Sequence, residues 1–201
     1  MKNDKGRIVA LDGLRGLACL SVVCFHLLNE TFGRLVPIVS NPITNFLFDG
    51  PLAVCLFFII SGEAISSSFF NGGGVPALVR TAIKRLPRLS IPVFFASLFT
   101  LVICYENLIY SPLVRDTLQK ADWRAFTSIT NINLFDVFKF SFSGVYHRYK
   151  GDSLNPFLWT MRYELLGSIL IISLLYSTKN KKFILPTFVL FLIISKKETI
   201  Y

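Results

Sequence analysis

Five long apolar segments separated by basic stretches constrain this chain more than any other feature of its sequence. A membrane helix needs about 20 mainly apolar residues to cross about 30 Å of hydrocarbon. The uncharged runs here are somewhat shorter, and the longest has 17 residues. One such run would fit the core of a soluble protein, but five of them, apolar on all faces, predict insertion into a membrane. The segments are Leu14–Phe32, Leu47–Phe69, Leu89–Tyr105, Pro156–Ser177 and Phe183–Ser195.

Composition excludes the main alternatives. Hydrophobic residues make up 53% of the chain and charged residues 16%, whereas a soluble domain carries about 25% charge. Disordered chains lack this apolar content. The net charge of +9 would suggest nucleic-acid binding in a soluble protein, but here the cations lie between apolar segments, so we expect no nucleic-acid partner. The sequence predicts an all-α membrane protein, a polytopic bundle of about five transmembrane helices whose surface contacts membrane lipid.

The basic residues also predict an orientation, because cytoplasmic loops are enriched in Lys and Arg. Cations precede the first segment, lie between the second and third, and lie between the fourth and fifth. We therefore expect a multi-pass protein of the cell membrane with a cytoplasmic N-terminus. The long loop at residues 106–155 would then be extracytoplasmic. The cations are Lys2, Lys5, Arg7, Arg15, Arg80, Lys84, Arg85, Arg88, Lys179, Lys181 and Lys182.

The first segment contains two candidate functional residues, Arg15 and His26. They are eleven residues apart, so a helix places them on one face, about 16 Å apart along its axis. An ionisable group inside a membrane helix is costly and often functional. The alternative for His26 is a histidine near the interface that hydrogen-bonds a neighbouring helix. Asn29-Glu30-Thr31 matches a glycosylation sequon but lies at the membrane edge and carries little weight.

The second and third segments add a packing site and a basic cluster. Ser61-Gly62 is typical of a site where membrane helices approach closely. Glu63 either is buried or reaches the inner surface at the end of its helix, and the second interpretation is favoured. Arg85 and Arg88 flank Pro87, which favours a helix that begins there. Such a helix start with two arginines would suit a phosphate; the simpler alternative is a basic stop signal without a ligand.

The fourth segment contains Trp159, Arg162 and Glu164. Trp159 suits a membrane interface. Arg162 and Glu164 are two residues apart, so they point to different sides of a helix and are poor partners for each other. We therefore expect each to have a partner elsewhere in the bundle.

Together these motifs resemble the acyltransferase-3 family of integral membrane O-acyltransferases, which includes sugar and lipopolysaccharide O-acetyltransferases. The resemblance covers about residues 7–180. It consists of Leu11-Asp-Gly-Leu-Arg15 with His26 after a ten-residue gap, Phe57-Phe-Ile-Ile-Ser61-Gly62, Arg85-x-x-Arg88, and Trp159 followed five residues later by Glu164. The combination in this order is specific, whereas each motif alone is weak.

The resemblance implies transfer of an acyl group, usually acetyl, from acyl-CoA to a hydroxyl of an extracytoplasmic glycan or lipid-linked sugar. By the same resemblance, His26 is the catalytic base with Arg15 on its face, Arg85 and Arg88 bind the donor, and Glu164 is the family's acid in the fourth segment. No metal is expected. A rival hypothesis is a non-enzymatic carrier or flippase component, in which a polar path is lined by His26, Glu63, Arg162 and Glu164.

Two features depart from the family pattern. Glu63 stands where members usually carry an aromatic or aliphatic residue. The family implies about ten membrane helices, and this chain has about half of them. We therefore expect residues 1–201 to be a single, incomplete acyltransferase domain, completed by a missing C-terminal half or by a second copy in a homo-oligomer.

Overall fold

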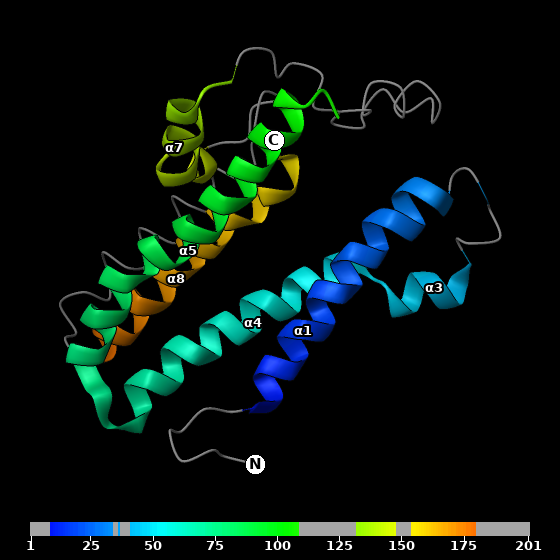
Figure 1. The fold of residues 1–201 in the computed structure, drawn as a ribbon. Coiled ribbons are helices and arrows are strands. Elements are labelled where there is room, and N and C mark those ends of the chain that lie inside the picture. The colour runs from blue at the N-terminus through cyan, green and yellow to red at the C-terminus, as the bar shows by residue number, and fades with distance from the viewer. Residues whose placement is uncertain (1–8, 34–35, 37–40, 109–131, 148–153, 180–201) are drawn as a thin grey trace, which may run out of the picture. The chain divides into compact units, whose positions relative to one another are not determined.

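A computed structural model of the chain describes residues 9–33, 36, 41–108, 132–147 and 154–179. These residues form helices and the turns that join them, with no β-strand among them. The chain divides into two compact units, Met1–Ser61 with Tyr110–Ala125 and Gly62–Ile109 with Phe126–Tyr201. Figure 1 shows their helices, and the boundary between the units falls inside helix α4.

The first unit is built on a long helical stretch near the N-terminus. Helix α1, Val9–Cys24, continues directly into η1, a π-helical segment at Phe25–Phe32. The short helix α3, Pro42–Leu47, and the beginning of α4, Gly50–Ser68, follow. Asn41 and Thr44 form a capping box that fixes the start of α3. Short π-helical insertions are rare and frequently occur at functional sites, so η1 is a notable part of this unit.

A close approach of the Phe25 ring to the backbone of Gly50 fixes η1 against the start of α4. Gly50 is buried, and a Cβ at this position would lie 2.6 Å from Cδ1 of Phe25. Only a glycine leaves room for that ring at this distance. The Asn29 side chain also donates a hydrogen bond from Nδ2 to the carbonyl of Phe48, at 3.4 Å. The segment that carries His26 is therefore attached to the turn before α4.

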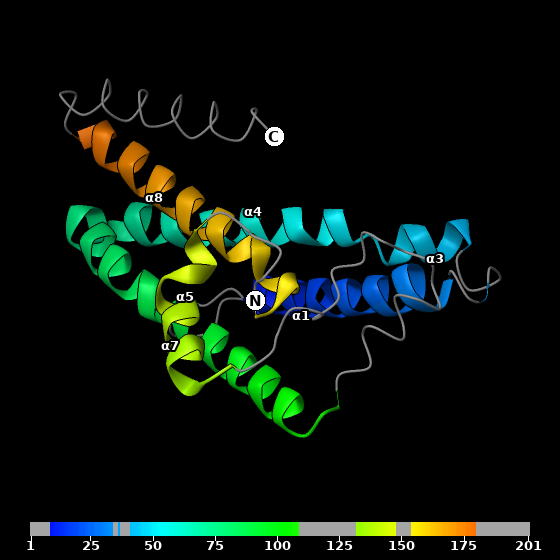
Figure 2. The same cartoon turned by 90° about the horizontal axis from the view of Figure 1, so that it is seen from above.

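In the second unit the chain turns sharply between α4 and α5 (Figure 2). The turn lies in η2, Phe69–Gly73, and α5 runs from Gly74 to Tyr105. Gly72 has φ +91° and Gly74 has φ +51°, in the left-handed region that glycine adopts without steric cost. These glycines therefore allow the sharp connection between α4 and α5.

Helix α5 begins earlier than the sequence predicted. Pro87 was expected to start the helix, and this is wrong, because Pro87 and Pro92 both lie inside a helix of 32 residues. A proline inside a helix costs about 3 kcal/mol. Packing of the preceding turns offsets this cost: Leu78 is buried in a cluster with Ile65, Phe69 and Leu175. Consequently no helix N-terminus is available at Pro87 to bind an anion.

The remaining helices of the second unit pack around α5. These are α7, Leu134–Phe142, then η3, Gly144–Tyr146, then η4, Pro156–Trp159, and α8, Thr160–Lys179. Helix α5 contacts α7 and α8, and α8 also contacts η3 and η4. Figure 1 shows α5 and α8 running in opposite directions. The Leu78–Leu175 cluster places Lys179 at the same end as Gly72–Gly74, as the alternation of basic stretches predicts. Helix α7 lies within residues 106–155, the stretch predicted to be a long extracytoplasmic loop. That stretch therefore contains a helix.

Much of the exposed surface of the long helices is apolar. Val9–Glu30, Pro42–Tyr105 and Phe157–Lys179 are long and apolar enough to cross a membrane, and the second of these contains both α4 and α5. Large side chains along them are exposed, among them Leu17, Phe95 and Leu174. Water-soluble monomers rarely expose apolar patches larger than a few hundred Å². The predicted all-α membrane fold is confirmed, while the fifth predicted segment, Phe183–Ser195, lies outside the described residues.

Candidate active site

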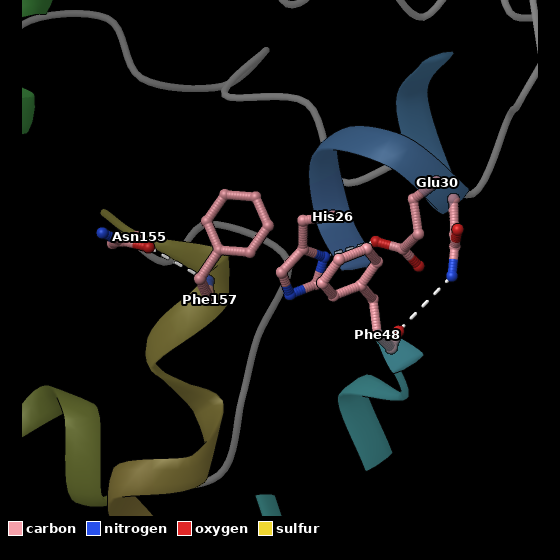
Figure 3. Close-up of polar contacts among 6 residues, drawn as sticks. His26, Glu30, Phe48, Asn155 and Phe157 are labelled. Carbon is pink, nitrogen blue, oxygen red and sulfur yellow. Dashed lines mark hydrogen bonds and ion pairs between the residues drawn. The ribbon is translucent and has the colours of Figure 1, made fainter. Parts of the chain in front are cut away.

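His26 lies in the first turn of η1 and pairs with Glu30. His26 Nδ1 is 2.5 Å from Glu30 Oε2 (Figure 3). The two side chains are 33% and 38% exposed. A carboxylate can only accept hydrogen bonds, so neutral His26 donates Nδ1–H to Glu30 and keeps its basic lone pair on Nε2. A carboxylate in this position fixes the tautomer of a histidine base and stabilises its protonated form.

The His26 ring also contacts an aromatic neighbour. Phe25 packs edge-on against it, with ring centroids 5.4 Å apart. Phe25 is in turn the side chain that occupies the space left by Gly50. The orientation of His26 therefore depends on a carboxylate from its own helix and on packing between η1 and α4.

Arg15 lies three turns before His26 on the same helical stretch. Its Nη1 donates to Asp12 Oδ1 at 3.1 Å, and both side chains are about one-third exposed. Eleven residues of helix separate Arg15 from His26 by about 16 Å along the axis, so the guanidinium does not reach the imidazole. Asp12, and not His26, is the group that Arg15 contacts.

In the second unit, an ion pair joins α5 to α8. Arg85 Nη2 donates to Glu164 Oε1 at 2.8 Å, and the two side chains are only 11% and 19% exposed. Glu164 thus has its partner on another helix, as the poor geometry of the neighbouring Arg162 predicted. Removing two charges from water is costly unless they are closely paired. The pair therefore fixes where α8 lies along α5.

A tyrosine from the segment after α7 lies close to this ion pair. The Tyr146 hydroxyl is 2.8 Å from the hydroxyl of Ser90, which is fully buried on α5. Burial raises the pKa of Tyr146 above its ordinary value; the hydrogen bond to Ser90 lowers it, and the negative charge of Glu164 raises it further. Arg85, Ser90, Tyr146 and Glu164 thus form one polar cluster contributed by three elements.

The other predicted residues occupy different surroundings. Arg88 is exposed on α5, and Arg162 is half-buried on α8.

Trp159 is partly exposed and packs edge-on against Tyr163, with ring centroids 5.7 Å apart. Glu63 is exposed, so it is not buried as the first interpretation had it, and its position at the inner membrane surface stays a prediction. A Cβ at Gly62 would lie 3.1 Å from the Ile171 side chain, which confirms the predicted close packing at this position.

The partners of these residues were not predicted from the sequence. Glu30 and Asp12 stand one helical turn from His26 and Arg15, a spacing that brings helical side chains together. This spacing alone is enough to predict Glu30 as the partner of His26 and Asp12 as the partner of Arg15. Tyr146 and Ser90 are 56 residues apart, and no local pattern connects them.

Comparison with known families agrees with these observations. A search of curated proteins and a search of solved structures returned no match. A model of the acyltransferase-3 family, described as an acyltransferase domain, matches residues 8–195. This match includes every candidate residue described above and nearly the whole chain. The protein therefore belongs to the acyltransferase-3 family of membrane acyltransferases.

Proposed function

We propose that this chain is a membrane O-acyltransferase that moves an acyl group, acetyl in the first instance, from acyl-CoA to a hydroxyl of an extracytoplasmic glycan or lipid-linked sugar. Membership of an acyltransferase family supports the reaction class. The observation that carries the proposal is the His26–Glu30 pair. A histidine oriented by a carboxylate on an apolar helix is suited to remove a proton from a hydroxyl.

The proposed reaction is direct transfer. Nε2 of His26 takes the proton of the acceptor hydroxyl, and the resulting oxygen nucleophile attacks the thioester carbonyl. The new C–O bond forms, the C–S bond breaks, and the CoA thiolate leaves with the proton from His26. Glu30 stabilises the imidazolium between these two proton transfers. Histidine is the side chain that most often serves as a general acid and base, so its residue type suits both proton transfers.

Arg85 and Arg88 are proposed to bind the phosphates of the donor. Both lie on α5, just before its uncharged run from Leu89 to Tyr105. Arg88 is exposed and able to meet a phosphate directly, whereas Arg85 is held by Glu164. We therefore assign Glu164 the role of a positioning residue for Arg85 in place of a catalytic acid. Arginine is the suitable residue type because its planar guanidinium forms two parallel bonds to a phosphate.

Donor binding at this end of α5 requires the N-terminus and the turn at Gly72–Gly74 to be cytoplasmic. The excess of cations in these stretches supports that orientation. A cysteine placed at the exposed Asn71 would test it. Labelling of this cysteine by an impermeant reagent from outside intact cells would contradict the orientation.

His26→Ala tests the proposed function. Transfer of acetyl from acetyl-CoA should fall by about 10²–10⁴-fold per folded molecule, the usual contribution of a general base. Insertion should persist, because alanine is tolerated in hydrocarbon better than imidazole. His147→Ala is the matched control, because His147 is exposed and lies at the end of η3. Near-normal transfer by the His26→Ala variant would remove the catalytic assignment and favour a carrier.

A further inference from the structure

Three cations form a stripe on the outer surface of α5. Arg80, Lys84 and Arg88 are all exposed and follow one another at intervals of four residues. A helix advances about 100° per residue, so the three side chains share an arc of about 80°. Within the described part of the chain, none of the three forms an ion pair. Arg85 points to a different side and is neutralised by Glu164.

The adjoining exposed face of the same turns is apolar. Val79, Ile83 and Leu86 are 52%, 70% and 40% exposed and share an arc of about 60°. The stripe directly precedes the uncharged run from Leu89 to Tyr105. Its cations extend over about 12 Å of helix, which places them where a spanning helix leaves the hydrocarbon for the headgroups. Lys179, exposed at the end of α8, lies at the same end of the unit.

We propose that Arg80 and Lys84 of this stripe bind the phosphates of anionic phospholipids. Cations with long side chains can extend to headgroup phosphates while their aliphatic stems remain against the hydrocarbon. Val79, Ile83 and Leu86 would contact the acyl chains of the same lipids. A soluble phosphate ligand would explain the cations but leave this apolar face without a partner. The inference does not depend on the proposed acyl transfer.

The test measures thermal stabilisation of the full chain in non-ionic detergent during titration with phosphatidylglycerol or phosphatidylcholine. A ligand that binds only the folded state raises the Tm. We expect phosphatidylglycerol to stabilise at lower concentration than phosphatidylcholine. In R80Q/K84Q that concentration should rise by about fivefold for each cation removed. Lys139→Gln, which removes an exposed cation of α7, is the control and should change nothing. Arg88 is left intact because it belongs to the proposed donor site.

A second measurement needs no variant. Raising the salt concentration from about 0.05 M to about 0.5 M should abolish the preference of the unaltered chain for phosphatidylglycerol, because the cations are exposed and salt screens them. Equal stabilisation by the two lipids, or an unchanged titration of R80Q/K84Q, would overturn the proposal. Coenzyme A alone serves as the soluble phosphate source. If R80Q/K84Q lost stabilisation by coenzyme A but kept that by phosphatidylglycerol, the stripe would belong to a soluble ligand.

Discussion

The two units contain charged pairs of opposite kinds. His26 and Glu30 are four residues apart on one helix, and each side chain is about one-third exposed. Arg85 and Glu164 are 79 residues apart on two helices and are nearly buried. An exposed pair within one helix adds little stability, whereas breaking a buried pair leaves one charge uncompensated. We infer that the first pair serves chemistry and that the second serves to hold helices together.

The largest expected effect comes from breaking the buried pair. Arg85→Ala should lower the free energy of unfolding by about 3 kcal/mol or more, because the nearly buried Glu164 carboxylate would lose its charged partner on α5. Denaturant unfolding in detergent measures this. Arg88→Ala is the matched control on the exposed face of the same helix and should change stability by less than about 0.5 kcal/mol.

A charge reversal sharpens this result. In R85E/E164R the two charges exchange places, so part of the lost stability should return. Failure of the double variant to exceed both single variants in stability would mean that the pair does not hold α5 to α8. The comparison between the two units would then lose its basis.

Breaking the exposed pair should affect rate more than stability. Glu30→Gln keeps the size of the side chain but replaces a charged acceptor with a neutral one. A hydrogen bond to a charged group contributes about 1.5–3 kcal/mol, so transfer should slow by about 10–100-fold. Stability should change little, because the pair is partly solvated. Acetyl transfer per folded molecule, compared with the stability of the same sample, separates these effects; a large loss of stability would contradict the assignment.

The contrast between contacts within one helix and contacts between distant helices also explains what could be predicted from the sequence. The helical class and the apolar segments follow from composition and run length. His26 and Glu164 stand out because ionisable residues are rare in such runs, and Arg85 stands out as part of the basic cluster before the third segment. Glu30 was predictable in principle, because helical spacing alone places it beside His26.

Long-range contacts could not be predicted in this way. Two contacts depend on how α5, η3 and α8 pack. They are the ion pair between Arg85 and Glu164 and the hydrogen bond between Tyr146 and Ser90. The start of α5 was misplaced for the same reason. Local propensity favours a break at Pro87, but Leu78 gains a buried position only if the helix already exists at Gly74.

A smaller effect should follow from filling the space at Gly50. Gly50→Ala places a Cβ against the Phe25 ring, and overpacking of this kind costs about 1–3 kcal/mol. Because Phe25 contacts His26, the transfer rate should fall as well. Gly13→Ala is the control, since a Cβ there meets no atom within 4 Å and alanine favours helix. A Gly50→Ala variant with normal rate and stability would show that this packing does not orient His26.

The smallest effect concerns the hydroxyl pair beside the buried ion pair. Tyr146→Phe leaves the buried Ser90 hydroxyl without the bond that Tyr146 provides, which should cost about 1 kcal/mol. Adding Ser90→Ala removes the second polar group as well, so Y146F/S90A should be more stable than Tyr146→Phe alone. Equal stabilities would mean that the two hydroxyls are not coupled.

The pH dependence of stability provides an independent measurement of the same bond. The pKa of Tyr146 is raised in the folded chain, mainly by burial, so the folded state holds this proton more tightly than the unfolded state. The contribution is fully present below the ordinary tyrosine pKa of about 10 and is lost as the pH rises through the higher folded value. The unaltered chain should therefore lose more stability above about pH 10 than the Tyr146→Phe variant, which has no proton to lose at this position. Because all other tyrosines and lysines titrate equally in both, the difference between the two curves isolates Tyr146. Parallel curves would show that Tyr146 is no more buried in the folded chain than in the unfolded one, and the polar cluster would then lack its third element.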